Sequence, residues 1–204
     1  MAVFTSGCSD FAKSHNERYR NNKYVNYDNT FLFESNDSDF VFTDTPDGYT
    51  IEKYTGTEKI VVFPREHNNK KIKRISEGVF IGNSTKIDVV YVGGNITEIA
   101  PKTFAGCSSL RKVVLSGGVK QIGSYAFSEC SNLKVVTIES KLETISDCIF
   151  SGCASLKQFK IPKSVRSISI NAFSELTPSF ELLVYSGSYG EEFAKNHNIK
   201  YEIV

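Results

Sequence analysis

The sequence is short of several residue types and patterns that define common protein classes. Its 204 residues include no Trp, one Met and three His, and 24 basic residues against 23 acidic ones leave a net charge of +1. Nucleic-acid-binding domains carry a basic excess, so this balance argues against that class. There is no apolar run of eighteen residues, so no membrane span is expected. The N-terminus also lacks the charged segment and apolar core of a signal peptide.

What the sequence does contain is an internal repeat. Isoleucine, phenylalanine and cysteine recur in steps of 23 residues. The positions are Ile99, Ile122, Ile145 and Ile168; Phe104, Phe127, Phe150 and Phe173; and Cys107, Cys130 and Cys153. A fixed period of this length is typical of a solenoid, in which each unit is too small to bury its own apolar face and stacks on its neighbours.

Each period contains the pattern L-x-x-V-x-L, first as Leu110, Val113 and Leu115. Its last two positions are two residues apart, so both side chains point inward from one short strand. The return limb then carries Val119, Ile122 and Phe127. We predict that an irregular chain or a short helical turn forms this convex side, with Pro101, Ser124 and Asp147 at the turn starts.

Two of the repeated phrases, IAPKTFAGCSSLRKVVL and IGSYAFSECSNLKVVTI, resemble the BspA-type (treponemal-type) leucine-rich repeat of bacterial surface proteins and some protist proteins. The resemblance covers about residues 47 to 204. It implies an α/β repeat fold: a right-handed leucine-rich-repeat solenoid with a short-stranded, concave parallel sheet. It also implies a location at the cell surface or outside the cell, which the sequence alone does not indicate.

The chain divides at about residue 46. Residues 47–204 form the predicted solenoid, with a C-terminal cap over 186–204 made of a short helix and a closing strand. Residues 1–46 are polar but rich in aromatic side chains, unlike disordered tails. Phe40 and Phe42 alternate before the turn at 45–48, and Tyr49 and Ile51 alternate after it, which predicts a hairpin. We interpret 1–46 as an N-terminal cap; a partly disordered segment is the alternative.

The functional prediction depends on the side chains that point outward from the predicted strands. Apolar residues fill eight of the twelve outward positions, which is more than a solvated face needs. The predicted partner-binding residues are Val62, Val89, Tyr91, Lys112, Val114, Val135, Thr137, Gln158, Lys160, Leu182 and Val184. A contiguous apolar patch usually marks an interaction site. Coverage by residues 1–46, contact with a second copy of the chain, and simple strand propensity are the alternatives.

An insert of five residues lengthens the first repeat and is basic. We expect it to form a rim beside the concave sheet. The basic residues of the segment 65–74 are Arg65, Lys70, Lys71, Lys73 and Arg74.

The repeated cysteines share their column with Leu176, so we predict that they are buried free thiols. Five cysteines is an odd number, which argues against a disulfide framework. Cys148 belongs to a column that otherwise holds polar residues, and Cys8 has no assigned place. A thiol nucleophile at either position, with His15, His67 or His197 as base, is the best enzymatic hypothesis. It rests on residue type alone, so no enzyme is predicted.

No spacing typical of a zinc site and no phosphate-binding loop occurs, so no cofactor or metal is expected. The sequence therefore predicts a non-catalytic module that binds a protein partner, such as a surface protein of a host or neighbouring cell, through the concave sheet. A structural module that uses the same face to form a homodimer is the alternative. Nucleic-acid binding is not expected.

Overall fold

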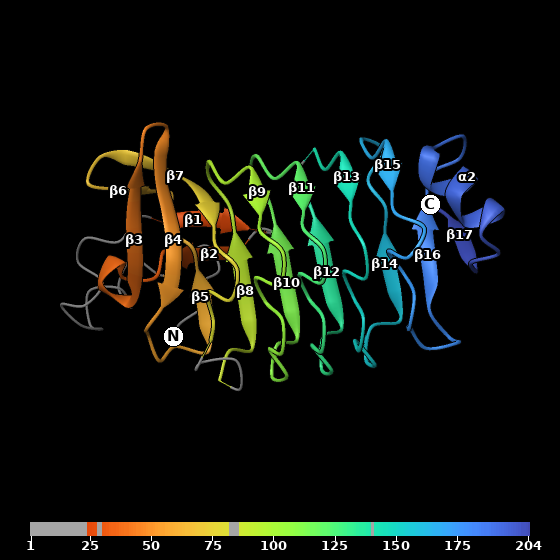
Figure 1. Ribbon diagram of the computed structural model, residues 1–204, viewed down its shortest axis with the longest axis horizontal. Coiled ribbons are helices and arrows are strands. Elements are labelled where there is room, and N and C mark those ends of the chain that lie inside the picture. The colour runs from red at the N-terminus through yellow and green to blue at the C-terminus, as the bar shows by residue number, and fades with distance from the viewer. Residues whose placement is uncertain (1–23, 28–29, 82–85, 140) are drawn as a thin grey trace.

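The computed structural model describes the backbone of residues 24–27, 30–81, 86–139 and 141–204, and the side chains from residue 34 within these ranges. Cys8 and His15 lie outside the described residues. The chain forms a row of similar turns, in which each turn adds one strand to each of two parallel arrays (Figure 1). This is the predicted leucine-rich-repeat solenoid.

The first array, called here the first sheet, contains the strands of the L-x-x-V-x-L pattern. Its members are β5 (Ile60–Val62), β8 (Val89–Val92), β10 (Lys112–Leu115) and β12 (Val135–Ile138), followed by β14 (Gln158–Lys160), β16 (Glu181–Val184) and β17 (Tyr201–Ile203). Lys112 pairs with Val89 on one side and Val135 on the other, so the register follows the 23-residue period. The ladder stops at β12 and restarts at β14, because β12 and β14 belong to different hydrogen-bonded sheets.

The second array, called the second sheet, joins the return limbs to the N-terminal hairpin. Its members are β3 (Phe40–Thr45), β4 (Gly48–Tyr54), β7 (Lys70–Ile75), β9 (Glu98–Ile99), β11 (Gln121–Ile122), β13 (Thr144–Ile145) and β15 (Ser167–Ile168), with β6 (Glu66–His67) paired to β7. The prediction for the convex side was therefore incomplete. Two residues per turn, such as Gln121 and Ile122, pair in register with the next turn, and turns rather than helices carry the rest of the described limb.

Aromatic stacking fills the space between the two sheets. The rings of Phe104 and Phe127 are 5.0 Å apart and nearly parallel, and Phe127 and Phe150 follow at 5.6 Å. All three side chains have no exposed surface. The 23-residue period of phenylalanine therefore corresponds to one ring per turn, as predicted, and each ring buries the next.

The repeated cysteines lie in the same core. Cys107, Cys130 and Cys153 are buried free thiols, as predicted. The Cys130 thiol donates to the Phe104 carbonyl (3.1 Å), and the Cys153 thiol donates to the Phe127 carbonyl (3.0 Å). Each thiol thus satisfies a backbone acceptor of the preceding turn. The adjacent thiols of Cys107 and Cys153, together with burial, raise the pKa of Cys130, so it remains protonated.

Both ends of the described stack carry additional elements. The predicted hairpin is present, since β3 and β4 pair antiparallel around the turn at 45–48, and β4 then pairs parallel to β7. Upstream lie β1 (Tyr24–Tyr27), β2 (Thr30–Phe33) and the 3₁₀ helix η2 (Asp37–Asp39). At the other end α2 (Tyr189–Asn196) begins at Ser188, whose side chain accepts from the Glu191 amide, and β17 pairs with β16.

Candidate interaction surface

The outer face, meaning the side of the first sheet turned away from the core, has two different halves. In its N-terminal half, Val62 and Val114 have no exposed surface and Tyr91 is 7% exposed. These three form a small apolar cluster of their own, with Ile60 and Val89 packed against it. Val62, Tyr91 and Val114 are therefore not open to a partner in this structure.

The segment after β2 lies directly against this half. Ser35 is 9% exposed, and its amide donates to the Val62 carbonyl at 2.9 Å. The Val62 amide in turn donates to the Ser35 hydroxyl at 3.0 Å. In Figure 1 the red β1–β2 hairpin lies behind β5, β7 and β8. The placement of Ser35 agrees with the alternative that residues 1–46 cover part of the apolar face.

The C-terminal half of the outer face is open. Val135 is 46% exposed, Gln158 and Lys160 are exposed, and Thr137 is partly buried. Lys112 lies between the two halves, with its ammonium 5.6 Å from the centre of the Tyr91 ring. The exposed residues among the predicted positions, Val135, Gln158 and Lys160, therefore lie in β12 and β14.

Leu182 and Val184 were assigned to the outer face, and this prediction was wrong. Both side chains are completely buried in the core, and Gln158 pairs with Glu181 instead of Leu182. The error came from aligning Phe180 with the first leucine of the repeat, which shifts the strand by one residue. Because side chains alternate along a strand, a shift of one residue exchanges the two faces. Glu181 and Leu183 occupy the outer positions.

Four of the five predicted rim residues do not border the outer face, so this prediction was wrong for them. Lys70, Lys71, Lys73 and Arg74 belong to β7, a strand of the second sheet. Arg74 binds both carboxylate oxygens of Asp47 at 3.0 Å, and Lys70 bonds to Asp44. Asp44 and Asp47 of the β3–β4 hairpin thus hold these basic residues at the N-terminal end of the solenoid.

Arg65 lies apart from those four residues and pairs with Glu34 at 2.8 Å, next to the Ser35–Val62 contact. Glu34 is buried, so this ion pair also fixes the segment that follows β2. The insert therefore holds the N-terminal elements together. Sequence reasoning missed this role because it treated the insert and residues 34–47 separately, although their charges are complementary.

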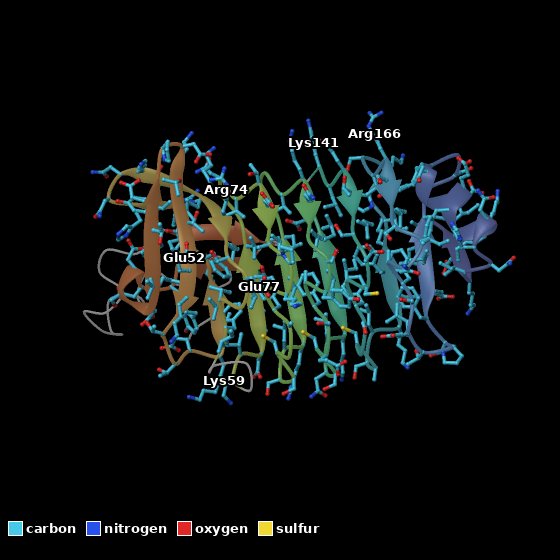
Figure 2. All side chains as sticks on the ribbon, in the orientation of Figure 1. Glu52, Lys59, Arg74, Glu77, Lys141 and Arg166 are labelled. Atoms are coloured by element: carbon cyan, nitrogen blue, oxygen red, sulfur yellow. The ribbon has the colours of Figure 1, made fainter. Side chains whose placement is uncertain are left out.

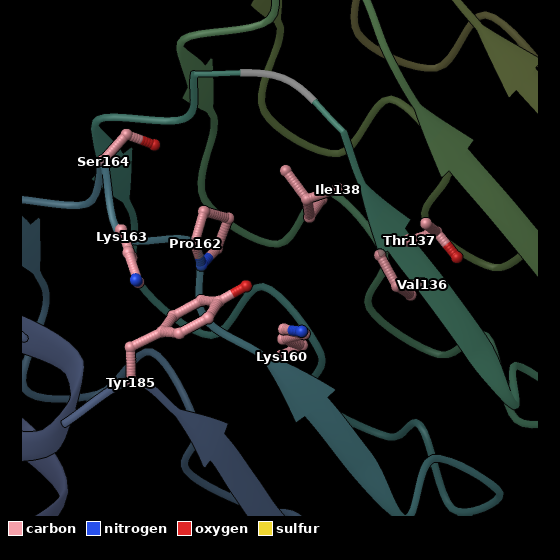
Figure 3. Close-up of a pocket in the computed structure, with 8 residues that line it drawn as sticks. All are labelled: Val136, Thr137, Ile138, Lys160, Pro162, Lys163, Ser164 and Tyr185. Carbon is pink, nitrogen blue, oxygen red and sulfur yellow. The ribbon is translucent and has the colours of Figure 1, made fainter. Parts of the chain in front are cut away.

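A hollow of about 380 Å³ lies at the interruption between β12 and β14 (Figure 3). It is lined by Val136, Thr137, Ile138, Lys160, Pro162, Lys163, Ser164 and Tyr185. Pro162 occupies the position that Ser116 and Glu139 hold in earlier turns, where each backbone amide donates to the preceding strand. Proline has no amide hydrogen, so it cannot make this bond to β12. Sequence reasoning named Lys160 and Thr137 but did not find the hollow.

The residues considered for catalysis are not brought together. The Cys148 sulfur lies 3.5 Å from the Ser174 hydroxyl oxygen, and its other hydrogen-bonding neighbour is the Tyr125 side chain. His67 is stacked on Phe42 and contacts Asp37 at 2.8 Å, while His197 packs on Phe193 at the C-terminal end. Neither described histidine is a hydrogen-bond partner of Cys148.

Two features are absent from the part of the chain that the structure describes. Within it, no group of three or more His, Cys, Asp or Glu side chains is arranged to hold a metal ion. Nor does this part contain a helix with the length and apolar character needed to cross a bilayer.

Comparison with known proteins defines the class. A family described as the BspA type leucine rich repeat region matches residues 65–187 in six copies. The chain therefore belongs to the BspA-type leucine-rich-repeat family. Repeat arrays of this family are generally non-catalytic scaffolds for interaction at surfaces. No curated protein matches the chain in sequence.

Several solved structures are similar. The leucine-rich-repeat protein TpLRR of T. pallidum is 27% identical with a TM-score of 0.67, over 74% of this chain and 71% of that one. The pneumococcal vaccine antigen PcpA is 21% identical with a TM-score of 0.50, over 81% and 50%, and shares the fold. A leucine rich cell surface protein of Faecalibacterium prausnitzii A2-165 is 24% identical with a TM-score of 0.49, over 72% and 53%. The chain thus spans about half the length of the last two.

Proposed function

We propose that this chain is a recognition module that binds a protein partner through the open, C-terminal half of the outer face. The observation that carries the proposal is the contrast between two valines that lie diagonally from each other on the outer face of adjacent strands, since Val114 pairs with Thr137 and Val135 pairs with Lys112. Val114 is fully buried, whereas Val135, its neighbour on the adjacent strand and the same face, is 46% exposed. An exposed apolar side chain beside polar and cationic ones is typical of interaction sites.

The proposed binding surface consists of six residues from three strands and the turn that follows them. They are Val135, Thr137, Gln158, Lys160, Leu183 and Tyr185. All lie outside the covered cluster, and all but Tyr185 belong to β12, β14 or β16. Membership of the family further supports a place at the cell surface and adhesion to a surface protein of a host or neighbouring cell as the biological setting.

Substitution of Val135 by Glu tests the proposal. Binding of the purified chain to a panel of purified surface and matrix proteins is compared with that of the Val135→Glu variant. Ile170→Glu is the matched control, because Ile170 is 68% exposed but follows β15 in the second sheet. We expect a partner whose affinity falls at least about tenfold with Val135→Glu and is unchanged with Ile170→Glu. Equal losses in both variants would refute the assignment of the surface.

The same variants separate partner binding from self-assembly. Size-exclusion chromatography with light scattering measures the mass of the unmodified chain in solution. We expect the mass of a monomer, in which the proposed binding surface is free to bind a different protein. A dimer that dissociates with Val135→Glu but not with Ile170→Glu would instead establish homodimerisation through this face.

A further inference from the structure

The hollow between β12 and β14 contains two lysines without a counterion. The ammonium groups of Lys160 and Lys163 lie 4.9 Å and 4.5 Å from the centre of the same ring, that of Tyr185. Neither lysine has an ion pair within the described residues. Glu181, the carboxylate on the neighbouring strand, is already engaged by Lys200 at 2.8 Å and by Gln158. Two positive charges therefore flank one aromatic ring without a counterion among the described residues.

The contact with Tyr185 orients both ammonium groups without using their hydrogen-bonding capacity. A cation over an aromatic ring gains electrostatic energy, but its N–H groups still need acceptors. Figure 3 shows the two lysines flanking the ring, with the Tyr185 hydroxyl pointing into the hollow. The site thus presents several donors toward one small volume, and an anionic acceptor fits them.

The walls restrict what kind of anion can enter. Ile138 and Pro162 supply an apolar boundary, and no carboxylate or amide side chain lines the hollow. A sugar ring packs against the open face of an aromatic side chain, but the lysines lie over the Tyr185 ring, so the hollow is less suited to a glycan. A carboxylate on a short apolar stem makes use of both the donors and the apolar wall.

We infer that the hollow receives the carboxylate of an Asp or Glu side chain from an extended segment of the protein partner, an inference that rests on the proposed function. Lys160 and Lys163 bind the carboxylate oxygens, and the aliphatic stem of the acidic side chain packs on Ile138 and Pro162. The site supplies specificity within the larger surface around Val135.

The test uses the intact chain and two fluorescein-labelled peptides, acetyl-Gly-Val-Glu-Val-Gly-amide and its Gln counterpart. Affinity is measured by fluorescence polarisation for the unmodified chain and for the Lys160→Gln/Lys163→Gln variant. Lys134→Gln/Lys141→Gln is the matched control, since both lysines are exposed and the net charge changes equally. In Figure 2 Lys141 projects away from the array.

We expect the Glu peptide to bind, and the Gln peptide to bind at least about tenfold more weakly. The Lys160→Gln/Lys163→Gln variant should lose a similar factor, and the control variant should stay within about twofold. Failure of the Glu peptide to bind, or undiminished binding by the double variant, would overturn the inference. Competition by free glucuronate or sulfate as effective as that by the peptide would also overturn it.

The inference and the proposed function can fail separately. If a partner found by the Val135 experiment keeps its affinity for the Lys160→Gln/Lys163→Gln variant, the surface assignment stands and the carboxylate site is wrong. If the peptide binds as expected but Val135→Glu changes no partner affinity, the site stands without the larger surface.

Discussion

Ser35 and Val62 exchange two hydrogen bonds at the free edge of β5: the Ser35 amide donates to the Val62 carbonyl, and the Val62 amide donates to the Ser35 hydroxyl. β5 is the first strand of its sheet, so these groups have no neighbouring strand. Unpaired edge groups invite association with other chains. One residue of the N-terminal segment therefore satisfies this part of the edge.

Replacing Ser35 by Ala should destabilise the fold. The buried Val62 amide would lose its acceptor, which costs about 1–3 kcal/mol of unfolding free energy. Urea denaturation monitored by circular dichroism measures the change. Ser131→Ala is the control, because Ser131 is exposed and its hydroxyl has no described partner; its effect should be below about 0.5 kcal/mol. Equal stability of the Ser35→Ala and Ser131→Ala variants would contradict this role for Ser35.

The two valines on adjacent strands of the outer face should respond differently to truncation. Val114→Ala should lower the unfolding free energy by about 2 kcal/mol, because the side chain is fully buried in the separate cluster. Val135→Ala should change it by less than about 0.5 kcal/mol, because that side chain is half-exposed. Thermal and urea unfolding of both variants measure this. A negligible effect at Val114 would mean that the N-terminal half of the face is open in solution.

Gly123 should tolerate a methyl group less well than Gly106. A Cβ at Gly123 would lie 2.5 Å from the Pro101 backbone nitrogen, so two turns would have to separate. We expect Gly123→Ala to cost about 3 kcal/mol. Gly106 has a φ of +73° but open space around it, so Gly106→Ala should cost only about 1 kcal/mol from the left-handed conformation. Equal losses in chemical denaturation would show that turn spacing is not the limiting factor.

The cysteines should differ in their reactivity with a thiol reagent. In a Cys8→Ser background, Cys148 should react first, because it is partly exposed. Cys107, Cys130 and Cys153 should react only as the protein unfolds because they are buried, and the labelling of Cys130 should stay slow at pH 9 because its pKa is also raised. Time-resolved DTNB labelling counts the thiols. Rapid labelling of more than one thiol in the native state would contradict the buried column.

Stability should fall in acid partly through Glu191. The side chain of Lys195 and the Gly187 amide hold the pKa of Glu191 below its ordinary value of 4.5. The carboxylate is thus favoured in the folded state, so its contribution is present above pH 4.5 and disappears as pH falls through the lowered pKa. Glu191→Gln should reduce the loss of stability between pH 5 and 3. Glu192→Gln, one residue along and exposed, serves as the control in acid-dependent thermal melts, and equal slopes for both variants would exclude a special role for Glu191.

The repeat made most of the core predictable. The 23-residue spacing of Phe104, Phe127 and Phe150 indicated one stacked ring per turn, and the hairpin around residues 45–48 followed from alternation and turn residues. Local signals were sufficient here because each turn contacts mainly the turns before and after it.

The candidate site was predictable only in part. Val135, Thr137, Gln158 and Lys160 were found from strand alternation, but Leu182 and Val184 were placed on the wrong face. One aromatic residue, Phe180, misled the alignment of the last turn, and only strand pairing resolves such a shift. The hollow at Pro162 was not predicted, because the loss of one backbone hydrogen bond has no sequence pattern other than the proline itself.

The sequence by itself determined the period, the inward residues of most turns and the membership of a repeat family, because these depend on contacts between neighbouring units of similar sequence. The tertiary structure decided which half of the outer face stays open. The edge contact between Ser35 and Val62 joins segments that have no repeat relationship. Such contacts arise from shape and charge complementarity across long sequence separations, which no local pattern records.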